Sequence, residues 1–358
     1  MSDYVYLDWA STAPVKYFAK DYYIPGNPNS NHALGLQANQ ALNEARKRIM
    51  DCLGVRSGKV LMGATASQLV DNLMWRIYRL GNYNILGSAY EHDCFNKWIE
   101  YHFTECPINQ VDKNEIMCWM MVNNITGAVF NVEQIGKMCR EAGAYYIMDA
   151  VAAIGHYPIS NNLESFCDCL ITSAHKYGGP QGVGCMWVSD RFAKFLELSD
   201  DSHEEYGLIH GTPNVSATVA MSYAMEHAVK LERQDRETKT LHYYSLFTYL
   251  AAKLVENKIE FEVVESKDNP KSTCAINAIT LYGINADALV QYLSTKFIYI
   301  SPGHSACADN DDYRVLEAFG LTKQEASQTV RISFGESTTQ EDVDTLVQGI
   351  VEFNNLFI

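Results

Sequence analysis

Short apolar runs alternate with segments of helical period between about residues 59 and 188. The apolar runs predict five strands, at Lys59–Met62, Asn84–Leu86, Ile116–Val122, Tyr145–Met148 and Cys169–Thr172. The periodic segments predict helices at Asp71–Leu80, Asp93–Phe103 and Val132–Ala142. This alternation favours a mainly parallel sheet with helices on both faces, which is an α/β fold.

The pattern changes after Asn214. A long helical segment runs through Glu232, shorter elements follow, and a last helical pattern covers Glu341–Phe353. These elements predict a smaller α+β domain at the C-terminus, with a boundary near residue 225.

Small or polar residues stand where the predicted strands end. They are Gly63-Ala64-Thr65, Glu91-His92, Asn123-Asn124, Asp149, and Ser173 to Lys176. In open α/β sheets, ligands bind beyond the carboxyl ends of the strands. We therefore expect these five strand ends to converge on one site.

Amino-acid composition argues against several classes of protein, namely those that bind nucleic acid, membranes or metal ions. The chain has 358 residues, of which 47% are hydrophobic, and its formal net charge is −15. It contains no cluster of Lys and Arg, so we expect it to bind neither nucleic acid nor an anionic membrane. Its first residues do not resemble a secretory signal, and no apolar stretch is long enough to span a bilayer. Its ten cysteines show neither a disulfide framework nor zinc-site spacing, which indicates a cytoplasmic protein without a metal site.

The stretch "ITSAHKYGGPQGVG", residues 171–184, places Lys176 at a strand end before a glycine-rich loop. A surface cation is one interpretation. The other is carbonyl chemistry with a phosphate-bearing pyridine cofactor, for which Ser173 and His175 offer phosphate donors. Such a cofactor also needs a carboxylate beside its ring nitrogen. Asp149 could supply it, although an aspartate after a strand is also a common helix N-cap.

The motifs of the whole chain resemble, in order, those of the cysteine desulfurases, which belong to the class V aminotransferase group of fold-type I pyridoxal phosphate enzymes. The matching stretches are "YLDWASTAP" (6–14), "GNPNSNHALG" (26–35), "GAT" (63–65), "EH" (91–92), "VNNITG" (122–127), "MDAV" (148–151), "SAHKYGGPQGVG" (173–184), "GTPNV" (211–215), "SACA" (305–308) and "VRISFG" (330–335). Each match is short, but ten in the same order are specific.

The resemblance implies the fold. It implies a large domain over residues 15–225, with a mainly parallel seven-stranded sheet between helices, which binds pyridoxal 5'-phosphate. It implies a small domain made of residues 1–14 and 226–358. It also implies a homodimer with active sites at the interface.

The resemblance also implies roles for single residues. Lys176 would carry the cofactor as a Schiff base, Asp149 would pair with its ring nitrogen, and Asn124 would hydrogen-bond its phenolic oxygen or the substrate. His92 would stack on the ring and assist proton transfer, although a histidine here could instead cap the following helix. The phosphate would be bound by the Ala64 main chain, Thr65, Ser173, His175 and, from the partner subunit, Thr212.

Two further residues would act on the substrate. Arg331 matches the arginine that receives the substrate carboxylate, although an arginine on a short strand could also be a plain ion-pair partner. Cys307 matches the nucleophilic cysteine, although one of ten cysteines could match by chance. Its small, polar surroundings suit an exposed thiol. His304 could help to lower the pKa of that thiol.

The chain departs from the family pattern at several positions. Ala152 replaces a glutamine that hydrogen-bonds the cofactor, and Trp9 replaces the asparagine of the opening motif. Three extra residues stand between Ser67 and Asp71, and Glu336 stands where long-loop members often carry an arginine.

We therefore predict a cysteine desulfurase that converts L-cysteine to L-alanine and leaves a persulfide on Cys307. The sulfur would pass to an acceptor protein, for example in iron–sulfur cluster assembly. One alternative is another class V lyase or aminotransferase acting on a different amino acid. The other is a weakly catalytic partner or regulatory subunit that retains the fold.

Overall fold

The chain forms two compact units in a computed structural model that describes residues 4–81, 83–105, 111–202, 204–265, 271–304 and 312–356. The larger one, here called the sheet unit, comprises Pro14–Met121 and Asn131–Gln234. The smaller one, the terminal unit, comprises Met1–Ala13, Val122–Phe130 and Asp235–Ile358. The domain limits expected from the sequence remain a prediction. The grouping of residues 122–130 with the two ends of the chain was not part of that prediction.

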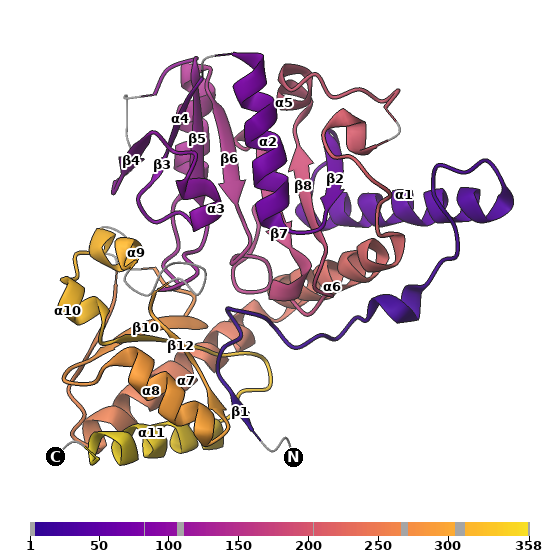
Figure 1. The fold of residues 1–358 in the computed structure, drawn as a ribbon. Coiled ribbons are helices and arrows are strands. Elements are labelled where there is room, and N and C mark those ends of the chain that lie inside the picture. The colour runs from indigo at the N-terminus through magenta and orange to yellow at the C-terminus, as the bar shows by residue number, and fades with distance from the viewer. Residues whose placement is uncertain are drawn as a thin grey trace. The chain divides into compact units, whose positions relative to one another are not determined.

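A mainly parallel sheet forms the centre of the sheet unit (Figure 1). Within the described residues it has seven strands in the order β2-β8-β7-β6-β5-β3-β4. Their bounds are β2 Lys59–Gly63, β3 Asn84–Ser88, β4 Tyr101–Phe103, β5 Glu115–Met120, β6 Tyr145–Asp149, β7 Cys169–Ser173 and β8 Gly184–Val188. Only β8 among them runs against its neighbours, β2 and β7. The α/β fold with a mainly parallel sheet is therefore confirmed.

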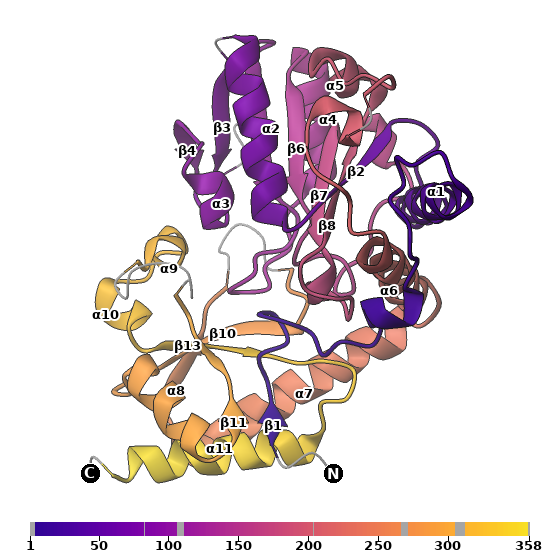
Figure 2. The same ribbon diagram turned by 45° about the vertical axis from the view of Figure 1, so that its right-hand side comes forward.

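Helices cover both faces of this sheet. Those described are α1 Ala33–Leu53, α2 Ala66–Leu80, α3 Asp93–Asn96, α4 Val132–Ala142, α5 Asp190–Phe195 and α6 Val215–Gln234, with 3₁₀ turns η1 Ala19–Tyr22, η2 Leu163–Ser165, η3 Ala174–Lys176 and η4 Glu205–Gly207. Helix α2 connects β2 to β3, which lies toward the β4 side of the sheet, whereas α4 connects β5 to β6, which lies toward the β2 side. The two connections therefore run across the sheet in opposite directions. Right-handed crossovers therefore place α2 and α4 on opposite faces (Figure 2). None of the helices in the described ranges is both long and apolar enough to cross a membrane.

The predicted helix at Asp93–Phe103 is wrong. The structure has a single helical turn, α3, followed by strand β4, which pairs in parallel with β3 through Leu86 and Tyr101. The apolar residues in this stretch also fit helical spacing, so periodicity misassigned it. Pairing with the edge of the sheet is a long-range contact, and it favours the strand for the aromatic residues Tyr101 and Phe103.

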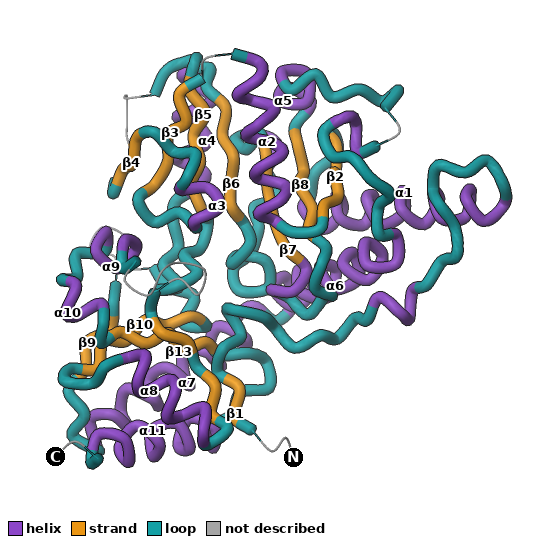
Figure 3. Tube along the Cα trace, viewed as in Figure 1, coloured by secondary structure: helices purple, strands orange, loops and turns teal. Residues whose placement is uncertain are grey.

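The terminal unit is an α+β structure (Figure 3). Its described strands form an antiparallel sheet in the order β12-β13-β10-β9 and a parallel pair of β1 with β11. The strands are β1 Val5–Tyr6, β9 Phe261–Val263, β10 Ile276–Leu281, β11 Ile298–Tyr299, β12 Ser301–Pro302 and β13 Thr329–Ser333. The helices are α7 Arg236–Glu256, α8 Ala286–Thr295, α9 Arg314–Ala318, α10 Lys323–Ala326 and α11 Gln340–Asn354. Helix α8 packs against β11, β12 and β13, and α11 packs against α7 and α8.

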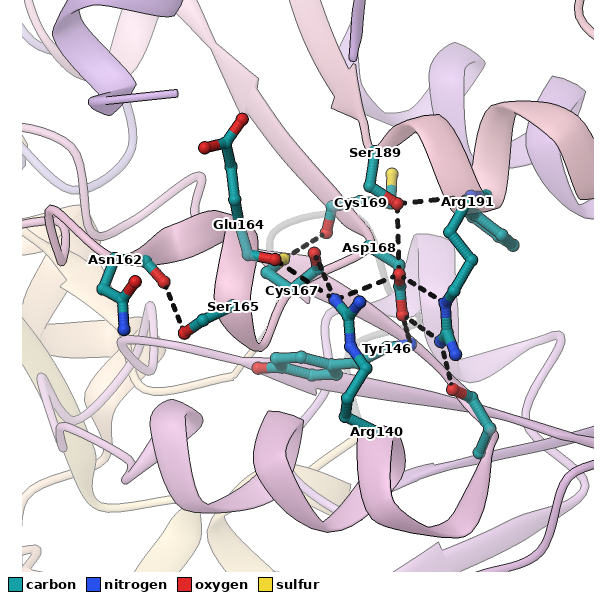
Figure 4. A network of polar contacts seen from close by, with 12 residues as sticks. Arg140, Tyr146, Asn162, Glu164, Ser165, Cys167, Asp168, Cys169, Ser189 and Arg191 are labelled. Carbon is teal, nitrogen blue, oxygen red and sulfur yellow. Dashed lines mark hydrogen bonds and ion pairs between the residues drawn. The ribbon is translucent and has the colours of Figure 1, made fainter. Parts of the chain in front are cut away.

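Asp168 ties three strands of the sheet unit together at the edge where β7 begins (Figure 4). Its carboxylate is 1% exposed. It accepts hydrogen bonds from the Tyr146 main-chain N–H at 3.1 Å, from Ser189 Oγ at 3.1 Å and from Arg191 Nη2 at 2.7 Å. Arg140 Nη2 lies 3.4 Å away. Asp168 therefore links the start of β6 to the end of β8.

Replacing Asp168 with Asn should destabilise the protein by about 3 kcal/mol, because two arginines lose their shared buried counter-charge. The free energy of unfolding from a urea titration measures this. A loss below about 0.5 kcal/mol would show that the network contributes little to stability.

Candidate active site

The polar strand ends lie side by side along one edge of the sheet. Asp149, the last residue of β6, pairs in register with Met120 of β5 and with Ile171 of β7. Ser173, the last residue of β7, pairs with Gly184, and Gly184 also pairs with Gly63 at the end of β2. The strand ends of the sheet unit are therefore aligned at one edge, as expected, and their forming one site remains a prediction.

Asp149 is a buried acid at the centre of this edge, with 6% of its surface exposed. Its Oδ1 accepts a hydrogen bond from the Val151 main-chain N–H at 2.8 Å. Burial raises the pKa of Asp149 above its usual value, and the Val151 N–H and the nearby His92 and Lys176 offset only part of this rise. Residues 151–156 form turns, so the helix-cap alternative is wrong. A buried carboxylate is a suitable partner for a protonated ring nitrogen, whose positive charge favours the ionised acid.

Lys176 ends the short turn η3, directly after β7. The loop behind it is held in place because the carbonyl of Gly178 accepts hydrogen bonds from the main-chain N–H groups of Lys16 and Tyr17, at 2.8 and 3.2 Å. Gly178 has φ +86°, a conformation that L side chains rarely adopt. These contacts fix the direction in which the chain leaves Lys176.

His175 is the residue before the lysine. Burial and the adjacent Lys176 lower its pKa to about 4. At pH 7 the imidazole is therefore neutral, with one N–H that can donate to a phosphate and without adding positive charge.

The N-terminus of α2 lies at the same edge and could hold a phosphate. A Cβ atom on Gly184 would come within 3.2 Å of the Ala66 main-chain nitrogen, so the glycine allows the helix to approach the strands. Thr65 caps the helix, and its Oγ1 accepts from the Gln68 N–H at 3.0 Å. The Ala64 N–H, expected to face the phosphate, donates to Gln68 Oε1 at 2.7 Å. Gln68 was missed in the sequence analysis, and its side chain accepts the hydrogen bond that the Ala64 N–H was expected to donate to the phosphate.

His92 caps helix α3, as the alternative interpretation proposed. Its Nδ1 accepts a hydrogen bond from the Cys94 main-chain N–H at 3.2 Å, and Cys94 Sγ lies 3.2 Å from the same atom. Burial raises the pKa of Cys94 above its usual range, so this residue remains a thiol. Ring stacking and proton transfer by His92 remain predictions.

Glu91 is a second residue that sequence reasoning did not interpret, although it stands directly before His92. Its side chain is fully buried. Oε1 accepts hydrogen bonds from Ser88 Oγ and, at 2.8 Å, from the Met120 main-chain N–H. Since Met120 is the register partner of Asp149, Glu91 joins the loop that carries His92 to the strand beside Asp149.

The remaining predicted residues belong to other parts of the chain. Asn124 and Arg331 belong to the terminal unit, where Arg331 Nη1 donates to the Asn124 carbonyl at 3.1 Å. Thr212 is an exposed residue of the sheet unit, three positions before α6 begins at Val215. Cys307 lies outside the described residues. His304, before it, contacts Asp287 of α8, with Nε2 3.1 Å from Oδ1.

Two departures from the family pattern have visible structural consequences. Ala152 is a buried apolar residue beside Val151, so it offers no side-chain hydrogen bond there. Trp9 packs on Gly335, where a Cβ atom would come within 2.0 Å of the indole ring. Its Nε1 donates to the Tyr6 carbonyl at 3.1 Å. Trp9 is therefore a packing residue of the terminal unit.

The residues at the sheet edge fit pyridoxal phosphate. The cofactor needs an acid for its ring nitrogen, a lysine for its aldehyde and neutral donors for its phosphate. Asp149, Lys176 and the pair Ser173 and His175 supply these groups within one unit, and Asp149 is close enough to Lys176 for the lysine's charge to affect its pKa. The described residues contain no cluster suited to a metal ion.

Comparison with known proteins places the chain among similar enzymes. The family model "Aminotransferase class-V" matches residues 99–346. The chain is 28% identical to a cysteine desulfurase IscS of Methanosarcina thermophila, over 97% of this chain and 91% of that protein. It is 28% identical to a putative cysteine desulfurase IscS 1 of Bacillus subtilis, over 97% and 98%. The solved structure of a NifS-like protein superposes with a TM-score of 0.83 and 24% identity, over 99% of this chain and all of that one.

Proposed function

The chain belongs to the class-V aminotransferase family, and from that premise we propose that it is a pyridoxal phosphate-dependent cysteine desulfurase. It converts L-cysteine to L-alanine and holds the removed sulfur as a persulfide on Cys307. The observation that carries this proposal is the position of the buried Asp149 at the end of β6, where both His92 and Lys176 are near enough to affect its pKa. Relatives named as cysteine desulfurases match 97% of the chain, which supports the choice among class V activities.

Each residue has a task in this reaction. When bound, the cofactor supplies an electron-accepting ring that stabilises the negative charge left at the substrate's α-carbon. Lys176 moves the α-proton with its neutral amine, and Asp149 keeps the proton on the ring nitrogen. Ser173, His175 and Thr65 bind the phosphate, and Arg331 binds the substrate carboxylate.

The sulfur step involves Cys307. The carbon–sulfur bond of L-cysteine breaks, a sulfur–sulfur bond forms on Cys307, and protons complete the alanine. The sum is one cysteine and one thiol giving one alanine and one persulfide, so no outside oxidant or reductant is consumed. An acceptor protein then takes the sulfur, and iron–sulfur cluster assembly is the destination we propose.

We propose that the protein acts as a cytoplasmic homodimer. Large apolar side chains are exposed along the N-terminal part of the sheet unit, at Phe18, Tyr23, Leu34 and Leu36. A second copy would cover such residues, and Thr212 would then complete the partner's phosphate site. The cysteines in the described ranges are all free thiols, which agrees with a reducing compartment.

A second candidate is another class V lyase, and the buried Ala152 favours it, because one polar contact expected near the cofactor is missing. That enzyme would act on L-cysteine or another amino acid without using Cys307.

Replacing Cys307 with Ser should abolish persulfide and alanine formation, because a hydroxyl without an adjacent base is a very weak nucleophile. Mass spectrometry after incubation with L-cysteine should find one added sulfur on the wild-type peptide that carries Cys307. Cys274→Ser, at a partly exposed thiol elsewhere, serves as the control and should keep full activity. Normal sulfur release by Cys307→Ser would replace the desulfurase proposal with the lyase.

A further inference from the structure

Asp8 binds three side chains from three segments of the terminal unit. Its Oδ1 accepts hydrogen bonds from Arg331 Nη2 at 2.9 Å, from Ser11 Oγ at 2.9 Å and from Ser301 Oγ at 2.8 Å. Arg331 comes from β13, Ser301 from β12, and Ser11 follows β1 along the chain. One carboxylate oxygen therefore connects the N-terminal segment to two strands of the antiparallel sheet.

The main chain around Asp8 is fixed as well. Asp8 forms a parallel bridge with Ser333, which lies two residues after Arg331 on β13. The Ser333 N–H donates to the Leu7 carbonyl at 2.8 Å, and the Ala10 N–H donates to Ser333 Oγ at 2.9 Å. Asp8 is thus held against the strand that carries Arg331.

The Arg331 side chain is 9% exposed, and both terminal nitrogens of its guanidinium have hydrogen-bond partners. Nη2 binds Asp8 and also contacts Ser11 Oγ, while Nη1 donates to the Asn124 carbonyl at 3.1 Å. Nε is buried and has no hydrogen-bond partner within the described residues. Because a guanidinium is planar, fixing both Nη atoms also fixes the direction of the Nε–H. A buried donor without a partner is costly unless a ligand accepts from it.

We propose that Asp8 is the positioning residue of Arg331, and that it orients the guanidinium so that the Nε–H is presented to the substrate carboxylate. This inference rests on the proposed function, in which Arg331 receives that carboxylate. The contribution of Asp8 is orientation and not charge, because a carboxylate beside Arg331 weakens the attraction for a second anion. The two contributions can therefore be separated by substitution.

Two variants of the cofactor-loaded enzyme make the separation. Asp8→Asn keeps an oxygen acceptor at the same place and removes the charge, whereas Asp8→Glu keeps the charge and moves the carboxylate by one methylene. Binding of L-alanine, the proposed product, is followed through the cofactor's absorbance, and KM and kcat are measured with L-cysteine. Ser301→Ala, which removes a donor to Asp8 and leaves the contacts of Arg331 intact, is the matched control.

Asp8→Glu should weaken L-alanine binding and raise KM by about tenfold to a hundredfold, with a smaller change in kcat, because the arginine is misplaced. Asp8→Asn and Ser301→Ala should stay within about threefold of wild type in both quantities. The inference is overturned if Asp8→Glu binds L-alanine normally, or if Asp8→Asn is as impaired as Asp8→Glu. Asp8→Asn leaves Arg331 without its counter-charge and lowers stability, so thermal unfolding is recorded for each variant. If Asp8→Asn does not fold, Asp8→Glu still decides.

The same measurements separate this inference from the proposed function. Suppose that Asp8→Glu weakens L-alanine binding as expected, but the wild-type enzyme releases no sulfur from L-cysteine. This result would support the role of Asp8 and contradict the desulfurase function. Unchanged L-alanine binding in Arg331→Lys would show that the carboxylate binds elsewhere, and the role of Asp8 would then be overturned as well.

Discussion

Asp149→Asn should slow the exchange of the substrate's α-proton with solvent by about a thousandfold. Asparagine has the same shape and can still accept the hydrogen bond from the Val151 N–H, which is 2.8 Å long in the wild type. It carries no charge, however, and cannot keep a proton on the ring nitrogen of the cofactor. The charge left at the α-carbon then has a much weaker electron acceptor.

Proton NMR of L-alanine in D₂O measures this exchange and does not depend on sulfur chemistry. Asp168→Asn is a matched control, because Asp168 is another buried aspartate of the sheet unit and directly precedes β7, at the opposite end of the strands from Asp149. It should lower stability and leave the exchange rate per folded molecule unchanged. Near-normal exchange in Asp149→Asn would remove Asp149 from the ring-nitrogen role.

Lys176→Ala should abolish covalent retention of the cofactor after borohydride reduction and reduce turnover to background. The amine at this position forms the link to the cofactor and also moves the α-proton, so one substitution removes two functions. The lost rate should therefore be at least as large as for Asp149→Asn.

Peptide mass mapping after reduction identifies the modified lysine. Lys16→Ala is the control, because its main chain is hydrogen-bonded to Gly178 in the same loop. That variant should keep the label on Lys176. A label that persists in Lys176→Ala, on any other lysine, would contradict the assignment and with it the interpretation of the whole strand-end site.

The alignment of the strand ends that carry Asp149 and Ser173 could be predicted from the sequence, because the carboxyl ends of parallel strands meet at one edge of a sheet. Asp149 and Lys176 follow neighbouring apolar runs, and the register of β6 with β7 brings these runs side by side. The order of motifs was sufficient to identify the family, which the match over residues 99–346 confirms. Local chemistry also indicated that His92 could cap a helix, and it does.

Other features depended on contacts between residues far apart in the chain. Strand β4 forms because β3 offers an open edge, whereas its own sequence also fits a helix. Gln68 reaches Ala64, and Glu91 reaches the Met120 N–H, through side-chain hydrogen bonds that no periodic pattern indicates.

The contacts of Arg331 show this division most clearly. The motif "VRISFG" that contains Arg331 could be recognised in the sequence, but Asp8, which accepts a hydrogen bond from Arg331, lies 323 positions away. Hydrophobic patterning determines which residues face a core, since it reflects the period of a helix or strand. Which polar groups meet depends on how strands from the two ends of the chain pair, and here the pairing of the N-terminal segment with β13 brings Asp8 to Arg331.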